Sequence, residues 1–187
     1  MERAIVELAR GGDEEAFASL IQMAGDRLMA IAFRILRDTD RAEDAVQQAI
    51  VTAWRDLPAL RDPDRFSAWL YRVLVNACYV EARKRRRWDA NVRLLDSDMA
   101  SGSADGFLSV EDRDELERAF RRLSTEQRAV FVLNHYAGMR LTDIGESLEI
   151  PVGTVKSRLH YATTALRAAI EADARITPSS PRGERLA

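Results

Sequence analysis

The 187-residue sequence contains only one cysteine and two histidines. A single cysteine excludes an internal disulfide, and because Cys78 lies in an apolar helical run we expect a buried core residue rather than a reactive thiol. His135 and His160 are too far from each other and from Cys78 along the chain to give the ligand spacing of a metal site. We therefore expect no bound metal and no other cofactor.

Long apolar runs are also missing. No stretch approaches the roughly 18 consecutive apolar residues that suggest a membrane span. Charges interrupt the apolar pattern of the N-terminal "MERAIVELARGGDEEAF", unlike a signal peptide. Nucleophile–base sets and phosphate-cradling glycine loops, which are typical of enzymes, are not visible. We expect a cytoplasmic protein without membrane insertion and without catalytic residues.

The formal net charge of −2 hides a segregation of charge along the chain. Residues 1–60 carry 7 Lys/Arg against 11 Asp/Glu, and residues 61–87 carry 8 against 3. Residues 88–126 carry 5 against 10, and residues 127–187 carry 8 against 6. Because nucleic-acid binding depends on local clusters of positive charge, the two basic blocks are candidates for it.

Apolar residues recur three and four positions apart almost throughout, which predicts an all-α protein. Residues 1–88 form a first small helical bundle. Residues 89–109 are rich in Ser, Asp, Gly and Ala, and we expect a flexible linker there. Residues 110–173 form a second bundle, followed by a disordered tail over residues 174–187.

Side chains that cap helices mark three of the expected starts. Asp13 is a candidate N-cap for the first long helix. Asp40 and Glu43 have capping-box spacing before the next helix, and Ser124 and Gln127 have it in the second bundle.

The stretch "LTDIGESLEIPVGTVKSRLHYATTALR", residues 141–167, has two apolar stripes that can face each other across a tight corner. Gly145 allows the two helices to approach closely, and Pro151 suits the first turn of the second helix. The pattern indicates a helix-turn-helix, which places the start of its second helix in the DNA major groove. The alternative is an ordinary helical hairpin with a solvated outer face. The candidates for DNA contact are the backbone at Gly153 and the side chains of Thr154, Lys156, Ser157, Arg158 and His160.

Residues 66–87 predict an amphipathic helix with a basic polar side. Arginines follow phosphates, aromatic rings stack on bases and amides bond base edges, so this side suits single-stranded DNA. A solvated face with a positive C-terminal end is the alternative. The preceding loop, "RDPDRF", is a candidate pocket for one extruded base. The candidates for strand binding are Arg61, Asp62, Asp64, Arg65, Arg72, Asn76, Tyr79 and Arg83.

The pattern "AEDAVQQAIVTAWRDL" predicts a helix with an acidic and amide outer face. Such a face repels DNA and suits a basic protein surface, whereas a plain solvated face is the alternative. Its members are Glu43, Asp44, Gln47 and Gln48.

The segments "RAEDAVQQAIVTAW", "FSAWLYRVLVNACYVEARKRRR" and "IPVGTVKSRLHYATTALR" resemble, in order and spacing, regions two and four of the extracytoplasmic-function (ECF) group of bacterial sigma factors. The resemblance to this sigma-70 group covers about residues 10–170. It implies a protein that binds core RNA polymerase and directs promoter recognition and DNA melting. In the family, region two grips the clamp helices of the polymerase and melts the minus-ten element. Region four recognises the minus-thirty-five element and sits on the polymerase flap.

The resemblance also implies roles for individual positions. The residues that match the clamp-binding segment are Asp44, Gln47, Gln48 and Trp54, with Trp54 partly in the core. The loop of residues 61–65 matches the loop that captures a flipped minus-ten base, and Asn76 matches a contact to the unpaired strand. The residues at the start of the promoter-recognition helix are Thr154, Lys156, Ser157 and Arg158. An anti-sigma factor that clamps both halves is the implied regulator.

Two positions depart from the family pattern. Tyr161 and Thr163 stand where a basic residue is frequent, which predicts fewer phosphate contacts through region four. This departure gives slight support to an alternative function, a sigma-mimicking adaptor that binds an anti-sigma factor without promoter activity. The basic run of residues 83–87 and the presence of Lys156 and Arg158 argue against the adaptor, which does not need them. An ordinary helix-turn-helix repressor would leave the first half of the chain unexplained.

Overall fold

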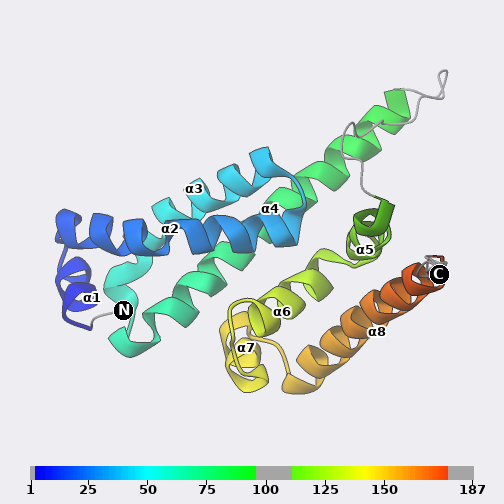
Figure 1. Ribbon diagram of the computed structural model, residues 1–187. Coiled ribbons are helices and arrows are strands. Elements are labelled where there is room, and N and C mark those ends of the chain that lie inside the picture. Colours follow the sequence, from blue (N-terminus) through cyan, green and yellow to red (C-terminus); the bar gives the residue numbers. More distant parts are fainter. Residues whose placement is uncertain (1–2, 96–110, 177–187) are drawn as a thin grey trace, which may run out of the picture.

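The computed structural model describes residues 3–95 and 111–176, which form α-helices and two short 3-10 helices without a strand among them (Figure 1). The first bundle consists of α1 (Arg3–Arg10), α2 (Glu14–Leu36), α3 (Thr39–Asp56), η1 (Leu57–Ala59), η2 (Pro63–Arg65) and α4 (Phe66–Leu95). The second consists of α5 (Glu111–Arg122), α6 (Thr125–His135), α7 (Leu141–Leu148) and α8 (Val152–Ile176). The predicted all-α fold of two helical bundles is confirmed.

Aspartate side chains begin both α2 and α3. Asp13 accepts a hydrogen bond from the backbone N–H of Ala16 at 2.9 Å, as predicted. The predicted start of α3 at Asp40 is wrong, because Asp38 accepts from the N–H of Arg41 at 3.1 Å and caps the helix earlier. Arg37 ends α2 in the left-handed conformation (φ 58°), so the connection between the two helices is very short.

Helix α2 is the central core helix of the first bundle. Among the described residues it is the one helix whose length and composition would allow it to cross a membrane. Its side chains Leu20, Leu28 and Ile31 are nevertheless fully buried in the protein core, where α2 packs against α3, α4 and α6. Helix α1, which the sequence analysis did not anticipate, covers α2 with Val6 and Ala9.

Helix α3 packs through a stripe of small residues. Ala42, Ala45, Ala49 and Ala53 are fully buried against α2 and α4. Alanine has no long side chain, so the α3 backbone lies close to its neighbours. The acidic and amide residues of α3 therefore face solvent on the opposite side.

Helix α4 is longer than predicted. It continues to Leu95, seven residues into the segment where a flexible linker is expected. Residues 89–95 contain neither glycine nor proline, and nothing in them stops the helix. The end of α4 projects beyond both bundles in Figure 1. Residues 96–109 of the expected linker lie outside the described residues.

The corner of the second bundle matches the predicted local chemistry. Ser124 and Gln127 form the predicted capping box, with hydrogen bonds of 3.2 and 2.9 Å. A Cβ atom at Gly145 would lie 3.1 Å from the carbonyl oxygen of Ile150, so α7 and the start of α8 approach closely there. Helix α8 runs to Ile176, slightly beyond the expected start of the tail, and residues 177–187 lie outside the described residues.

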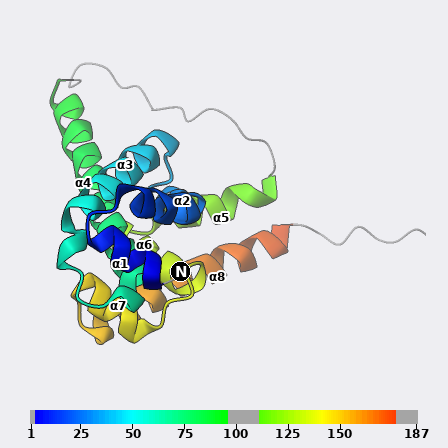
Figure 2. The same ribbon diagram turned by 90° about the vertical axis from the view of Figure 1, so that its left-hand side faces the viewer.

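The two bundles lie against each other rather than apart. Helices α6 and α7 pack on α2 and α4, as both ribbon views show (Figures 1 and 2). One buried apolar cluster runs through both bundles and joins Leu28 and Leu74 to Val132, Leu133 and Ile144. The described residues thus form one closed body, an arrangement that the sequence analysis left open.

Candidate nucleic-acid interface

The start of α8 presents polar side chains to solvent. Val155 and Ala162 are fully buried and fix the orientation of the helix. Lys156, Ser157 and His160 are exposed on its other side, as predicted. No atom lies within 4 Å of the position that a Cβ would take at Gly153, so a ligand could approach the backbone there.

The remaining two candidates on α8 are only partly exposed. Thr154 accepts a hydrogen bond from the Ser157 hydroxyl at 3.0 Å through its backbone carbonyl. Arg158 lies close enough to Tyr79 of α4 and Glu126 of α6 to influence both electrostatically. The basic surface of α8 thus extends toward the junction between the bundles.

Helices α3 and α4 border an open groove of about 1030 Å³. Arg61, Arg72 and Asn76 line it from the loop and α4, and Gln48 lines it from α3. The structure thereby brings three predicted strand-binding residues together in one groove. Trp69 also lines this groove. The sequence analysis did not include Trp69 among the candidates for strand binding.

Two aspartates of the loop before α4 hold it in place through a hydrogen bond and an ion pair. Asp62 caps η2 by accepting a hydrogen bond from the N–H of Asp64 at 3.0 Å. Asp64 in turn forms an ion pair with Arg3 of α1 at 2.8 Å. A hollow of about 270 Å³ opens beside the loop between Arg61, Asp62, Trp69 and the end of α7. The loop therefore borders a space of the kind that the extruded-base prediction requires.

Two candidates further along α4 differ in exposure. Arg83 is exposed, as predicted. Tyr79 was expected on the strand-binding side, but its ring packs against the apolar cluster and its hydroxyl is buried without a hydrogen-bond partner. Burial raises the pKa of Tyr79 to about 12, and nearby Arg158 acts in the opposite direction. The reason is the closed arrangement, which brings the second bundle over this part of α4.

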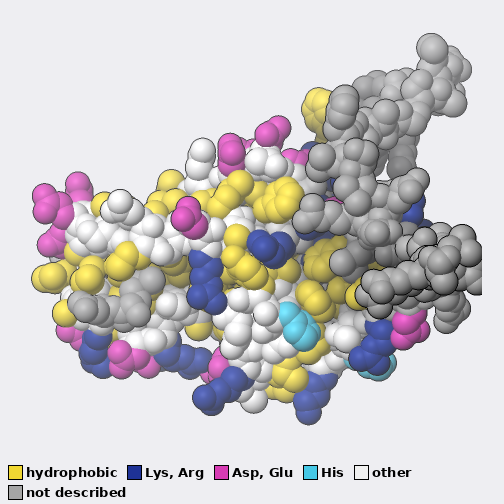
Figure 3. Space-filling view, in the orientation of Figure 1, with side chains coloured by type: hydrophobic (Ala, Val, Ile, Leu, Met, Phe, Trp, Pro, Cys, Tyr) yellow, Lys and Arg dark blue, Asp and Glu magenta, His cyan; other side chains and the backbone are white. Residues whose placement is uncertain are grey.

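The outer face of α3 carries the acidic and amide side chains together. Glu43, Asp44, Gln47 and Gln48 are all exposed. In Figure 3 acidic side chains lie along the top edge of the molecule, over α3, and also at its left end, whereas most basic side chains lie across the middle and the lower edge. Trp54 is partly buried, and its ring centroid lies 5.0 Å from that of Phe17, which confirms its place partly in the core.

Carboxylates of α7 cover two of the predicted DNA-binding arginines. A guanidinium nitrogen of Arg65 lies 2.6 Å from a carboxylate oxygen of Glu146, and Arg72 forms the same contact with Glu149. The hydrogen bond that Arg65 donates to Glu146 raises the pKa of Arg65. The sequence analysis missed both glutamates. Glu146 lies in the last turn of α7, and Glu149 follows the helix as its C-cap in the left-handed conformation (φ 55°). The sequence does not tell which surface they meet.

Additional contacts hold the bundles together away from α4. Arg27 of α2 donates a hydrogen bond to the backbone carbonyl of Ala137 at 3.0 Å. The guanidinium of Arg34 lies 4.0 Å from the ring centroid of Tyr136. These contacts and the shared apolar cluster fix how the second bundle lies on the first.

Comparison with known families assigns a class to each bundle. A model of sigma-70 region 2 matches residues 20–88, and a model of sigma-70 region 4 matches residues 113–166. The two bundles therefore define a sigma-70-type transcription factor.

Relatives narrow the assignment. The ECF RNA polymerase sigma factor SigW of Bacillus subtilis is 31% identical, over 87% of this chain and 92% of its own. The ECF sigma factor SigL of Mycobacterium tuberculosis is 34% identical, over 86% and 94%. The chain belongs to the ECF sigma factors of RNA polymerase, which confirms the resemblance seen in its sequence motifs. It is a promoter-recognising sigma factor and thus a DNA-binding regulator of transcription.

Two solved structures have a similar fold. One is CnrH in complex with the cytosolic domain of CnrY, with a TM-score of 0.66 and 27% identity, covering 91% of this chain and 97% of that chain. The other is the sigma factor RpoE in complex with the anti-sigma factor NepR from Bartonella quintana, with a TM-score of 0.66 and 26% identity, covering 84% and 98%.

Proposed function

We propose that the groove between α3 and α4 holds the melted strand of the minus-ten element. The observation that carries this proposal is the meeting of Arg61, Arg72 and Asn76 in one open groove. Arginine binds the phosphates, Asn76 bonds a base edge, and the ring of Trp69 offers a surface for stacking. The hollow beside Asp62 receives one flipped base. The hydrogen bond between Asp62 and the backbone of Asp64 maintains the conformation of the loop.

Helix α8 contacts the minus-thirty-five element in this proposal. Lys156, Ser157 and His160 are exposed at its start, where a helix-turn-helix meets base edges. The backbone at Gly153 contacts a phosphate, and Thr154 and Arg158 complete the surface. Tyr161 is exposed where a cation would add another phosphate contact, so we expect region four to bind DNA weakly without polymerase.

The outer face of α3 docks on the polymerase clamp helices, and the second bundle docks on the flap. Glu43, Asp44 and Gln47 are exposed together on one helix face, which suits a basic protein surface. Trp54 supports this face from the core side through its contact with Phe17.

The closed arrangement is an off state in this proposal. Arg65 and Arg72 are paired with glutamates of α7 and Tyr79 is covered, so the strand-binding surface becomes complete only when the bundles separate. A cytoplasmic anti-sigma factor that binds both bundles would preserve the closed state. Support for such a partner comes from the similar structures of CnrH and RpoE, each solved with a bound partner.

A reconstituted transcription assay tests the proposal. Transcript starts mapped after overexpression supply the promoter, and the purified protein is added to core polymerase on that template. Lys156→Glu should reduce transcription about tenfold on a template with the minus-thirty-five motif, because one charge-assisted contact is replaced by repulsion. The matched control is Arg167→Glu, which makes the same charge change at an exposed site farther along α8.

Two outcomes would contradict the proposal. Absence of promoter-dependent transcript with the unmodified protein would favour the sigma-mimicking adaptor. Equal losses for Lys156→Glu and Arg167→Glu would show that α8 acts through general charge rather than through its first turns.

A further inference from the structure

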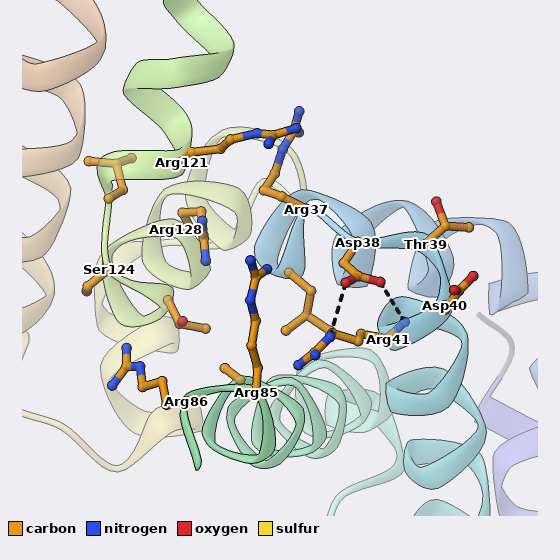
Figure 4. A pocket seen from close by; sticks show the side chains of 14 residues that line it. Arg37, Asp38, Thr39, Asp40, Arg41, Arg85, Arg86, Arg121, Ser124 and Arg128 are labelled. Atoms are coloured by element: carbon orange, nitrogen blue, oxygen red, sulfur yellow. Dashed lines mark hydrogen bonds and ion pairs between the residues drawn. The ribbon is translucent and has the colours of Figure 1, made fainter. Parts of the chain in front are cut away.

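A second cavity lies at the junction of the bundles, on a side of the molecule without an assigned role. Its volume is about 650 Å³, and five helices border it: the end of α2, the start of α3, the middle of α4, the end of α5 and the start of α6. Figure 4 shows the side chains that line it. Six of them are the arginines Arg37, Arg41, Arg85, Arg86, Arg121 and Arg128, and two are the carboxylates Asp38 and Asp40.

Two of the carboxylates near this cavity, Asp38 and Glu117, are already engaged. Asp38 caps α3 and pairs with Arg41 at 3.1 Å. Glu117 of α5 pairs with both Arg37 and Arg121. Among the described residues at the cavity, the six arginines outnumber the carboxylates of Asp38, Asp40, Glu117 and the nearby Glu126.

Arg128 has a buried donor at the cavity. The residue is half-buried, and no described residue forms a hydrogen bond with its Nε atom, although the carboxylate of Glu126 lies near enough to favour its charge. In Figure 4 its guanidinium end and that of Arg85 are directed toward one another across the cavity. Burial lowers the pKa of Arg128 to about 10, and the positive charges of Arg37 and Arg85 add to this effect. An arginine in these surroundings is stabilised by an anion rather than by another cation.

We propose that this cavity binds a small phosphate-bearing anion, of the size of a nucleoside polyphosphate. Guanidinium groups bind phosphate through paired hydrogen bonds, and the volume lies in the range of small-molecule sites. The N-termini of α3 and α6, at Thr39 and Thr125, both border the cavity and add positive partial charge. Arg85 and Arg86 belong to the first bundle, and Arg121 and Arg128 to the second. The bound anion therefore bridges the bundles and stabilises the closed arrangement over the open one.

The phosphates of a DNA backbone have the same chemistry as a small phosphate-bearing anion. The experiment therefore measures the binding of both kinds of ligand. Binding of inorganic tripolyphosphate to the full-length protein is measured by titration calorimetry at low chloride. Binding of a short single-stranded DNA is measured in parallel by fluorescence anisotropy. The variants are Arg128→Gln and Arg86→Gln inside the cavity, and Arg167→Gln as the control with the same charge change elsewhere. Arg86 is exposed, so its replacement tests the site even where Arg128→Gln folds poorly.

The expected result is tripolyphosphate binding that weakens about tenfold in each cavity variant and less than about twofold in Arg167→Gln. Arg128→Gln should leave single-stranded DNA binding within about twofold, because Arg128 lies away from the α3–α4 groove. Equal weakening by all three variants would show non-specific attraction and overturn the proposal. Loss of DNA binding in Arg128→Gln, with no tripolyphosphate binding by the unmodified protein, would assign the cavity to DNA instead. Neither result bears on promoter recognition, which the transcription assay tests separately.

Discussion

The two surfaces proposed to bind DNA differ in how far the closed arrangement exposes them to solvent. Lys156 and Ser157, on α8, are exposed to solvent. On α4 and its preceding loop, Arg65 and Arg72 are paired with glutamates of α7. In the proposed function, the carboxylates of Glu146 and Glu149 thus occupy positions that phosphates of a DNA strand would take. The closed form covers part of the proposed strand-binding surface and leaves the proposed duplex-binding surface largely open.

The difference also indicates what holds the bundles together. The Arg65–Glu146 and Arg72–Glu149 pairs are largely exposed, and solvent and salt screen such pairs strongly. The apolar cluster that joins Leu28 of α2 to Leu133 of α6 is fully buried. We infer that apolar contact supplies the strength of the closed state, while the ion pairs select which surface is covered.

The largest expected effect comes from reversing the charges on the covered side. Arg65→Glu with Arg72→Glu removes two phosphate contacts and creates repulsion toward the strand, so transcription from a duplex promoter should fall about 100-fold or more. The same variant repels α7 and should open the closed form, which small-angle X-ray scattering measures as a larger radius of gyration. An open protein that has lost activity would separate DNA binding from closure. Unchanged transcription would exclude α4 as the strand-binding helix.

Local chemistry accounts for the elements that the sequence predicted correctly. The Ser124–Gln127 capping box and the close approach at Gly145 involve neighbours in the chain, and their spacing is visible in the sequence. The exposed polar side of α3 follows from its buried alanine stripe in the same way.

Contacts between distant segments account for what the sequence did not predict. The pairing of Glu149 with Arg72 joins residues of different bundles, and no periodicity encodes a partner across that separation. Tyr79 shows the same limit, because its place on the polar side of α4 was predicted but the second bundle covers it. The end of α4 was missed because residues 89–109 as a whole are rich in Ser, Asp, Gly and Ala, although the first seven of them contain neither glycine nor proline.

A smaller effect is expected from reversing the partners on α7. Glu146→Arg with Glu149→Arg should also open the protein, because both ion pairs become repulsive. It leaves Arg65 and Arg72 intact, so single-stranded DNA binding by the free protein should strengthen several fold as the competing carboxylates are removed. Scattering and fluorescence anisotropy measure the two results.

The control for added positive charge is Glu15→Arg with Glu171→Arg, which makes the same charge change at two exposed positions, one on α2 and one on α8. This control should leave the radius of gyration unchanged and strengthen DNA binding less than the α7 variant does. If both variants strengthened DNA binding equally, competition between α7 and DNA would be excluded. The α7 variant should retain transcription, whereas Arg65→Glu with Arg72→Glu should lose it. This difference would show that transcription needs the arginines and not the closed form.

The smallest expected effect concerns Tyr79, whose hydroxyl is buried at the junction without a partner. Tyr79→Phe removes that unsatisfied group and should raise the free energy of unfolding by about 1 kcal/mol. Burial raises the pKa of Tyr79 to about 12 from its ordinary value of 10, so the native state holds this proton more tightly than the unfolded state. Its contribution to stability is therefore complete below pH 10 and is lost as the pH rises toward 12.

Unfolding by urea at pH values from 8 to about 12 measures this contribution, and Tyr79→Phe should lose less stability than the parent above pH 10. Cys78 provides an internal control, because burial raises its pKa from 9.0 to about 12. The stability linked to the Cys78 proton is therefore lost from a lower pH onward, in the parent and in Tyr79→Phe alike. Identical alkaline profiles of parent and Tyr79→Phe would mean that the hydroxyl ionises freely. The second bundle would then not cover Tyr79 in solution, and Tyr79 could not be counted as part of a covered surface on α4.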